Sequence, residues 1–307
     1  MATITGLKRG WSWLSQARPA GAGEEADGTG PAGSAGTLPP PKPFAPPHVP
    51  NPVYAIGPVR GEVGLLRQLV ARILRDLPRR PSGLGLRDTT GAPVGRRQPV
   101  ADLVLLGNLA AGGRDGLAVL DCIADIVAEP SLRLTLLRGP QEWRLCRLLA
   151  GECDGQDWLR EGGISFLTAT GIDPRLGGAP PRLRAEIESV LGPRRALLEG
   201  MPPSLLIGNM LFSHGGGQAA APIEDQDAET LVMGAGIGRP PPRADGIWTV
   251  HAGPLTDLGG PRTGVLGLCT GVHYAQRLVA LRIDTDGGLG LLEASEAPAA
   301  PQVHEAR

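Results

Sequence analysis

Apolar residues recur along the chain in alternating strand-like and helix-like patterns. Residues 53–56 form a continuous apolar run, as in a buried strand, and from Val63 to Leu77 apolar residues recur at helical spacing. Residues 102–107 and 132–139 repeat the strand signature. Each of these runs ends at a glycine, and helical patterns follow at 115–128 and 141–152. Three strand–loop–helix units in succession predict a parallel sheet.

The second half of the chain has a different pattern. Helical periodicity at 157–170 and 182–199 gives way to short strand-like segments at 204–214, 246–251, 264–271 and 277–284. Short strands that follow a parallel α/β unit predict a second sheet packed against the first.

The two ends of the chain have few large apolar side chains. We therefore predict disordered tails at residues 1–52 and 286–307, with one folded domain at 53–285. Within the first tail, residues 8–14 combine Lys8 and Arg9 with two tryptophans. A frayed terminus, a docking motif and a weak contact with a membrane surface are all compatible with this segment.

Charge and cysteine content narrow the function classes. The 30 basic and 31 acidic residues give a net charge of −1, so no surface for bulk nucleic-acid binding is expected. No apolar run reaches the roughly 18 residues of a membrane span, and no apolar signal-peptide region is present. The four cysteines form no C-x-x-C pair. These features predict a cytoplasmic protein with reduced thiols and no transmembrane segment.

The loops that follow the first three predicted strands are the candidate site, because α/β proteins bind ligands at the carboxyl ends of parallel strands. They read YAIGPVRGEVGLL from residue 54, LGNLAAGGRD from residue 106 and RGPQE from residue 138. The first loop holds Pro58 and Arg60 where a catalytic loop would hold an acid, a nucleophile or a metal ligand. A glycine run, GAGIGRP at 234–240, follows no strand and opens no helix, so we do not interpret it as a dinucleotide site.

Further segments complete a resemblance: WLREGG from residue 158, FSHGGG from 212, VHAGPL from 250 and LCTGVHYAQRLVALRID from 268. In this order, the seven segments resemble the metallophosphoesterase superfamily, specifically its bacterial serine/threonine phosphoprotein phosphatases and the neighbouring diadenosine tetraphosphatases. The resemblance implies a four-layer αββα sandwich of two mixed sheets flanked by helices. In that family, two divalent cations (Mn, Fe or Zn) activate water and clamp the phosphate.

The resemblance also assigns family roles to positions of this chain. The six metal-ligand positions are Pro58, Arg60, Asn108, Pro140, His214 and Gly253. Only His214 is a strong ligand, since proline and glycine offer no side-chain donor and arginine is a cation. The general-acid position is Gln141, its supporting acid falls on Ala111, and the phosphate-binding arginine falls on Gly112. We therefore expect no metal cofactor.

The loss of these ligands predicts a pseudophosphatase, a catalytically inactive relative with a binding or regulatory role. Its candidate anion-binding cleft consists of Arg60, Asn108, Arg138, Gln141, His214 and His251. The cleft would take a phosphoprotein or a small phosphorylated ligand. The protein would otherwise act through its outer surface on an active phosphatase or another component of a kinase pathway. The simpler interpretations are a solvated Arg60 and an Arg138 that is ion-paired with Glu142.

Two alternatives are left open. A metal-dependent serine/threonine protein phosphatase or phosphoesterase with rearranged ligands would bind the two cations through acids from elsewhere, such as Asp102 or Asp115. The sequence places both acids outside the cleft. A paralogue without a selected role is compatible with the same residues.

Overall fold

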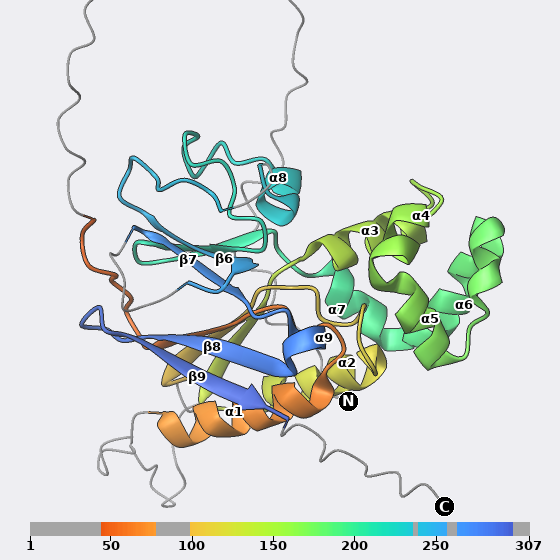
Figure 1. Cartoon of the computed structure of the whole chain (residues 1–307), viewed down its shortest axis with the longest axis horizontal. Coiled ribbons are helices and arrows are strands. Elements are labelled where there is room, and N and C mark those ends of the chain that lie inside the picture. Colours follow the sequence, from red (N-terminus) through yellow and green to blue (C-terminus); the bar gives the residue numbers. More distant parts are fainter. Residues whose placement is uncertain (1–43, 78–98, 236–238, 257–262, 297–307) are drawn as a thin grey trace, which may run out of the picture. The chain divides into compact units, whose positions relative to one another are not determined.

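A computed structural model describes residues 44–77, 99–235, 239–256 and 263–296 of the chain. These residues form two mixed β-sheets flanked by helices, so the predicted α/β fold class is confirmed (Figure 1). The segment at residues 8–14 lies outside the described residues. None of the described helices is long and apolar enough to cross a membrane.

The first sheet has five strands in the order β3-β2-β1-β8-β9. Their bounds are β1 Val53–Ile56, β2 Ala101–Leu105, β3 Leu132–Leu136, β8 Arg277–Ile283 and β9 Leu289–Ser295. Strands β1, β2 and β3 are mutually parallel, as the sequence predicts, whereas β8 and β9 are antiparallel additions on the other side of β1. The carboxyl ends of the three parallel strands therefore meet at one edge, where their loops form the candidate site.

The second sheet has four strands in the order β4-β5-β6-β7. Their bounds are β4 Ser204–Ile207, β5 Met210–Ser213, β6 Trp248–Pro254 and β7 Val265–Cys269. The prediction of one strand-like segment at 204–214 is wrong, because the chain reverses at Gly208 and Asn209 to pair β4 with β5. Gly208 has φ 58, a left-handed conformation that glycine adopts readily.

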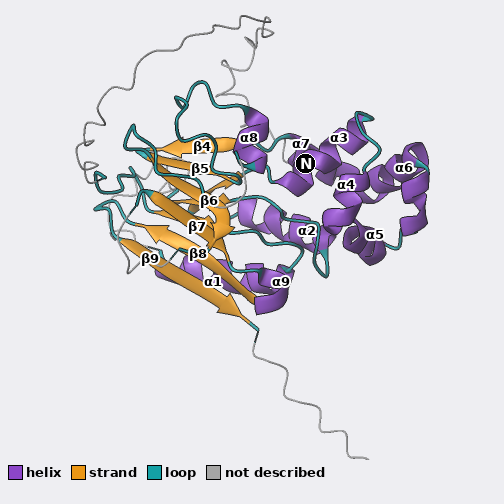
Figure 2. Ribbon diagram, turned by 45° about the horizontal axis from the view of Figure 1, so that its top comes forward, coloured by secondary structure: helices purple, strands orange, loops and turns teal. Residues whose placement is uncertain are grey.

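Helices cover the outer face of the first sheet and continue into a helical region beside it (Figure 2). The α-helices are α1 Val63–Asp76, α2 Gly116–Val127, α3 Pro140–Ala150, α4 Gln156–Trp158, α5 Ile164–Thr170, α6 Pro180–Leu191, α7 Arg195–Glu199, α8 Ala228–Met233 and α9 Val272–Ala275. A π-helical turn, η1 Leu159–Gly163, joins α4 to α5, and two 3-10 turns are η2 Pro174–Gly178 and η3 Gly192–Arg194. The helical patterns at 157–170 and 182–199 are thus each interrupted.

Two apolar cores follow from the alternation of side chains along the strands. In β1, Tyr54 and Ile56 pack with the helices, whereas Val53 and Ala55 pack with residues of the second sheet such as Phe212. All four β1 residues are buried, which explains why the strand reads as a continuous apolar run rather than an alternating one.

The folded part of the chain extends beyond both predicted domain boundaries, residues 53 and 285. At the amino-terminal side, the Phe44 ring packs edge-on against Trp248 at 5.9 Å between ring centroids, and Val49 is 1% exposed. The Trp248 indole N–H also donates to the carbonyl of Ala45 at 2.8 Å. At the other end, the segment predicted to be a tail from 286 forms strand β9. All seven residues of β9 are paired with residues of β8.

Candidate functional site

Backbone hydrogen bonds join the loops after β1 and β2. The N–H of Arg60 donates to the carbonyl of Asn108, and the N–H of Gly61 donates to the carbonyl of Leu109, each at 2.7 Å. A Cβ atom on Gly113 would lie 1.7 Å from the carbonyl oxygen of Arg60. Gly113 therefore allows a close approach between the two loop backbones.

The Glu142 carboxylate holds the second and third loops together from the first turn of α3. Oε2 accepts from the N–H groups of Asn108 (2.8 Å) and Gly139 (3.0 Å), and Oε1 accepts from the N–H of Leu109 (2.7 Å). The residue is 2% exposed. Its position at a helix amino terminus favours the negative charge. Glu142 is thus engaged by backbone amides and is not the ion-pair partner of Arg138.

Asn108 and His214 meet at the centre of the site. Asn108 Oδ1 accepts from the N–H of Gln141 at 3.0 Å, which points Nδ2 toward His214 Nε2 at 3.4 Å. His214 Nδ1 lies 2.6 Å from the carbonyl oxygen of Leu106, which can only accept a hydrogen bond. The network therefore assigns the proton to Nδ1 and the lone pair to Nε2, facing the Asn108 amide.

Burial and positive charge keep His214 neutral. The pKa of His214 is lowered to about 4, mainly by burial and to a smaller extent by Arg60 and His251, against the opposing effect of the Leu106 hydrogen bond. In the described part of the chain, the Arg60 guanidinium has no carboxylate partner. Its backbone is in the left-handed region at φ 50, which is uncommon for arginine. The site therefore carries a partly exposed cation beside a neutral imidazole.

His251 fills the space next to Gly253. His251 Nδ1 accepts from the N–H of Gly253 at 3.1 Å, so the proton is on Nε2, which is buried with no acceptor among the described residues. A Cβ atom on Gly253 would lie 2.2 Å from Cε1 of this imidazole. Burial, with a smaller effect of Arg239, lowers the pKa of His251 to about 4. A side chain at 253 would thus need the ring to move.

The structure does not bring Arg138 to the other five residues of the predicted cleft. Its Nη2 donates to the carbonyl of Glu199 at 2.7 Å, and its guanidinium lies over the Trp143 ring, 5.9 Å from the centroid. The interpretation of Arg138 as an ion-pair partner of Glu142 is also wrong. The side chain extends from the loop after β3 toward α7, and the sequence of the loop does not specify this direction.

The remaining family positions carry little chemistry. Gln141 Nε2 donates to the carbonyl of Glu161 at 2.7 Å, and Gln141 Oε1 is buried without a donor among the described residues. Pro58 and Ala111 are buried, and Pro140 forms the first residue of α3. The N–H of Gly112 donates to Ser165 Oγ at 3.0 Å. None of these positions supplies an acid or a base.

The donor set does not fit a pair of divalent cations. The described residues contain no group of three or more His, Cys, Asp or Glu side chains that could hold a metal ion. Asp102 binds Arg133, with an Nη2 to Oδ2 distance of 2.7 Å, and Asp115 caps α2 by accepting from the N–H of Ala118 at 2.9 Å. Both acids are therefore engaged outside the cleft, as the sequence indicates.

Arg239 is a site residue that sequence reasoning missed. The positive charge of Arg239 contributes to the lowered pKa of His251, and its Nη2 donates to Thr263 Oγ1 at 2.9 Å. It lies in the glycine run GAGIGRP at 234–240, which has no strand and helix pattern typical of a dinucleotide site. In the sequence, the one feature that indicates Arg239 is its position as a basic residue shortly before the strand-like segment 246–251.

Comparison with solved structures finds chains that resemble this one in fold. A candidate diadenosine tetraphosphatase superposes with a TM-score of 0.51 at 15% identity, covering 82% of this chain and 97% of that chain. A serine/threonine phosphatase from Saccharomyces cerevisiae with similarity to human PP5 gives 0.41 at 13%, covering 82% of each chain. The hypothetical protein PH1004 from Pyrococcus horikoshii OT3 gives 0.43 at 12%, covering 80% and 89%. At these identities, the likeness concerns the fold.

No protein-family model matches the sequence, and no curated protein matches it either.

Replacing Arg60 with alanine should raise the pKa of His214 above about 4, because it removes a nearby positive charge. The value should stay below the ordinary 6.5, since burial is the larger cause. The measurement is an NMR titration of the imidazole Cε1–H signals. Arg239→Ala is the matched control, because it should raise the pKa of His251 and leave that of His214 unchanged. If the pKa of His214 is the same in Arg60→Ala as in the wild type, the Arg60 guanidinium does not lie close to His214.

Proposed function

We propose that this protein binds a phosphate monoester, on a protein or a small molecule, without hydrolysing it. The observation that carries the proposal is the Arg60 guanidinium, which is partly exposed, lies beside the neutral His214 and has no carboxylate partner among the described residues. A guanidinium offers a planar fork of donors that matches phosphate oxygens.

The electrostatics around Arg60 support binding of an anion over binding of a cation. The carboxylate oxygens of Glu142 already accept three backbone N–H groups of the loops. Arg239 adds a second positive charge near His251. The amino terminus of α3 contributes the positive end of its helix dipole on the same side, where Gln141 N–H binds Asn108.

The residues at the family positions support binding without hydrolysis. Water activation in a two-metal phosphoesterase needs oxygen and imidazole ligands for both cations. Here His214 Nε2 faces the amide of Asn108, and the His251 ring occupies the space beside Gly253. These contacts support a binding role over the alternative of a phosphatase with rearranged ligands.

The first test measures metal content and hydrolysis. Protein purified without chelators should contain substoichiometric Mn, Fe and Zn, and should not hydrolyse p-nitrophenyl phosphate when Mn²⁺ is added. Stoichiometric metal, or turnover that His214→Ala abolishes, would replace the proposal with the enzyme alternative.

The second test measures binding of phosphate by thermal shift with inorganic phosphate and O-phosphoserine. Because a ligand that binds the folded state raises its stability, both should raise the melting temperature of the wild type. Arg60→Ala should lose the shift. Arg72→Ala, at an exposed arginine of α1, is the matched control and should keep it. Equal shifts in both variants would contradict the assignment of Arg60.

A further inference from the structure

Two neighbouring cavities lie along α3, on a side of the helix that the phosphate-binding proposal does not use. Their volumes are about 510 and about 580 Å³, and they share Trp143, Arg147 and Glu229. We call this feature the α3 groove. Pro140, Trp143, Arg147 and Ala150 form its floor, three to four positions apart along one stripe of the helix.

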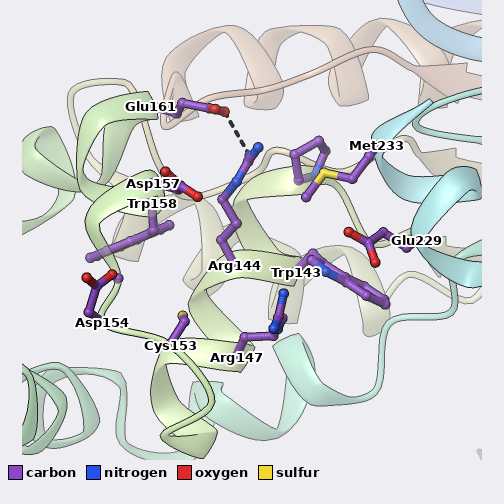
Figure 3. A pocket seen from close by; sticks show the side chains of 12 residues that line it. Trp143, Arg144, Arg147, Cys153, Asp154, Asp157, Trp158, Glu161, Glu229 and Met233 are labelled. Carbon is purple, nitrogen blue, oxygen red and sulfur yellow. Dashed lines mark hydrogen bonds and ion pairs between the residues drawn. The ribbon is translucent and has the colours of Figure 1, made fainter. Parts of the chain in front are cut away.

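The walls of the α3 groove come from three other segments. Residues 153–161, which include α4, form one side of the first cavity, and α8 contributes Glu229 and Met233 opposite them (Figure 3). Glu152 and Glu199 border the second cavity. The groove thus runs along α3 between α8 and the turn that leads into α4.

Negative charge exceeds positive charge in the α3 groove. Its lining includes six carboxylates: Glu152, Asp154, Asp157, Glu161, Glu199 and Glu229. It includes three arginines, each already engaged. Arg144 binds Glu161 at 2.7 Å, Arg147 binds Glu152 at 3.3 Å, and Arg138 donates to the carbonyl of Glu199.

Two of the carboxylates are available to a ligand. Glu229 is exposed on α8 and has no ion-pair partner in the described part of the chain. Asp154 is exposed and accepts only from the N–H of Gln156, at 3.0 Å, among the described residues. Basic side chains of a ligand could therefore pair with these two carboxylates without breaking an existing ion pair.

The indoles of Trp143 and Trp158 give the groove an aromatic part. Trp158 is 0% exposed, and the N–H groups of both indoles are buried without an acceptor among the described residues. An unpaired buried donor costs free energy that a peptide carbonyl would recover. Trp143 already carries the Arg138 guanidinium over its ring, so it is suited to a cationic neighbour.

We propose that the α3 groove binds an extended basic segment of a partner protein. Its lysine or arginine side chains pair with Glu229 and Asp154 on opposite sides of the first cavity, and its backbone carbonyls accept from the indole N–H groups. The 11 residues of α3 span about 16 Å, which an extended chain covers with about five residues. This proposal stands independently of the phosphate site, because its carboxylates and indoles take no part in that site.

The test is fluorescence anisotropy with the full chain and fluorescein-labelled hexa-arginine, at low and high salt. The wild type should bind, and binding should weaken as salt rises because screening reduces the attraction. The double variant Asp154→Asn/Glu229→Gln should bind at least about tenfold more weakly, since two charge contacts are removed. Glu186→Gln, at an exposed carboxylate of α6, is the matched control and should bind like the wild type.

Three results would overturn the proposal: no binding of hexa-arginine, equal binding by the double variant and the wild type, or tighter binding of labelled hexa-glutamate than of hexa-arginine. Circular dichroism of each variant checks that the fold is intact. All three substituted residues are exposed, so their replacement should leave the fold unchanged.

Discussion

Replacing Glu142 with alanine should lower the free energy of unfolding by about 3–5 kcal/mol, the largest stability effect expected from a single substitution near the site. The carboxylate accepts from the N–H groups of Asn108, Leu109 and Gly139, and the residue is 2% exposed. Without it, three buried donors lose their partner. Urea denaturation followed by circular dichroism measures the change.

Two further variants separate this effect from a general cost of mutating a helix. Glu186→Ala, at an exposed position of α6, should stay within about 0.5 kcal/mol of the wild type. Glu142→Gln should recover only part of the loss, because an amide has one acceptor oxygen for three N–H groups. If Glu142→Ala unfolds at the same urea concentration as the wild type, the hydrogen bonds from the loops to Glu142 do not stabilise the fold.

Acidification from about pH 6.5 to about pH 4 should destabilise the protein through its two buried histidines. Burial lowers the pKa of both His214 and His251 from 6.5 to about 4. Between these values the unfolded chain binds protons that the folded chain does not bind. Stability is therefore full above the unfolded pKa and falls as pH drops toward the folded one. Together the two groups should account for a few kcal/mol.

Substitution of the histidines tests this pH dependence. His251→Asn keeps an acceptor for the Gly253 N–H, and it should flatten the fall in stability between pH 6.5 and pH 4. His48→Asn, at an exposed histidine, is the matched control and should keep the wild-type profile. Glu62 acts in the opposite direction, because burial raises the pKa of its carboxyl. Thermal unfolding measured between pH 6.5 and pH 4 gives the stability of each variant. If the stability of His251→Asn falls with pH as steeply as that of the wild type, His251 is not a source of the pH dependence.

Much of the first sheet could be predicted from sequence because its signals are local. The apolar run of β1 and the helical period of α1 need no knowledge of distant residues. The same holds for the glycines of the loops, and the parallel order of β1, β2 and β3 then brings Asn108 and Gln141 together. The contact between Asn108 and Gln141 therefore follows from the parallel pairing of β2 with β3.

The errors arose where a distant partner decides the structure. Strand β9 reads LGLLEAS, which has no regular alternation of apolar and polar residues, and its strand structure depends on pairing with β8. Two residues, Gly208 and Asn209, form the turn between β4 and β5, and a glycine next to an asparagine is a local signal of a hairpin. The direction of the Arg138 side chain and the space filled by His251 depend on packing, which a sequence pattern does not specify.

The position of β1 in the first sheet constrains the order in which the protein can fold. One neighbour of β1 is β2, about fifty residues along the chain, but the other is β8, which ends at Ile283. During synthesis, β1 has no antiparallel neighbour until the chain has been made as far as Ile283. Pairing over such long separations is slow to form. The central strand of the sheet is therefore the first to be synthesised and among the last to be completed.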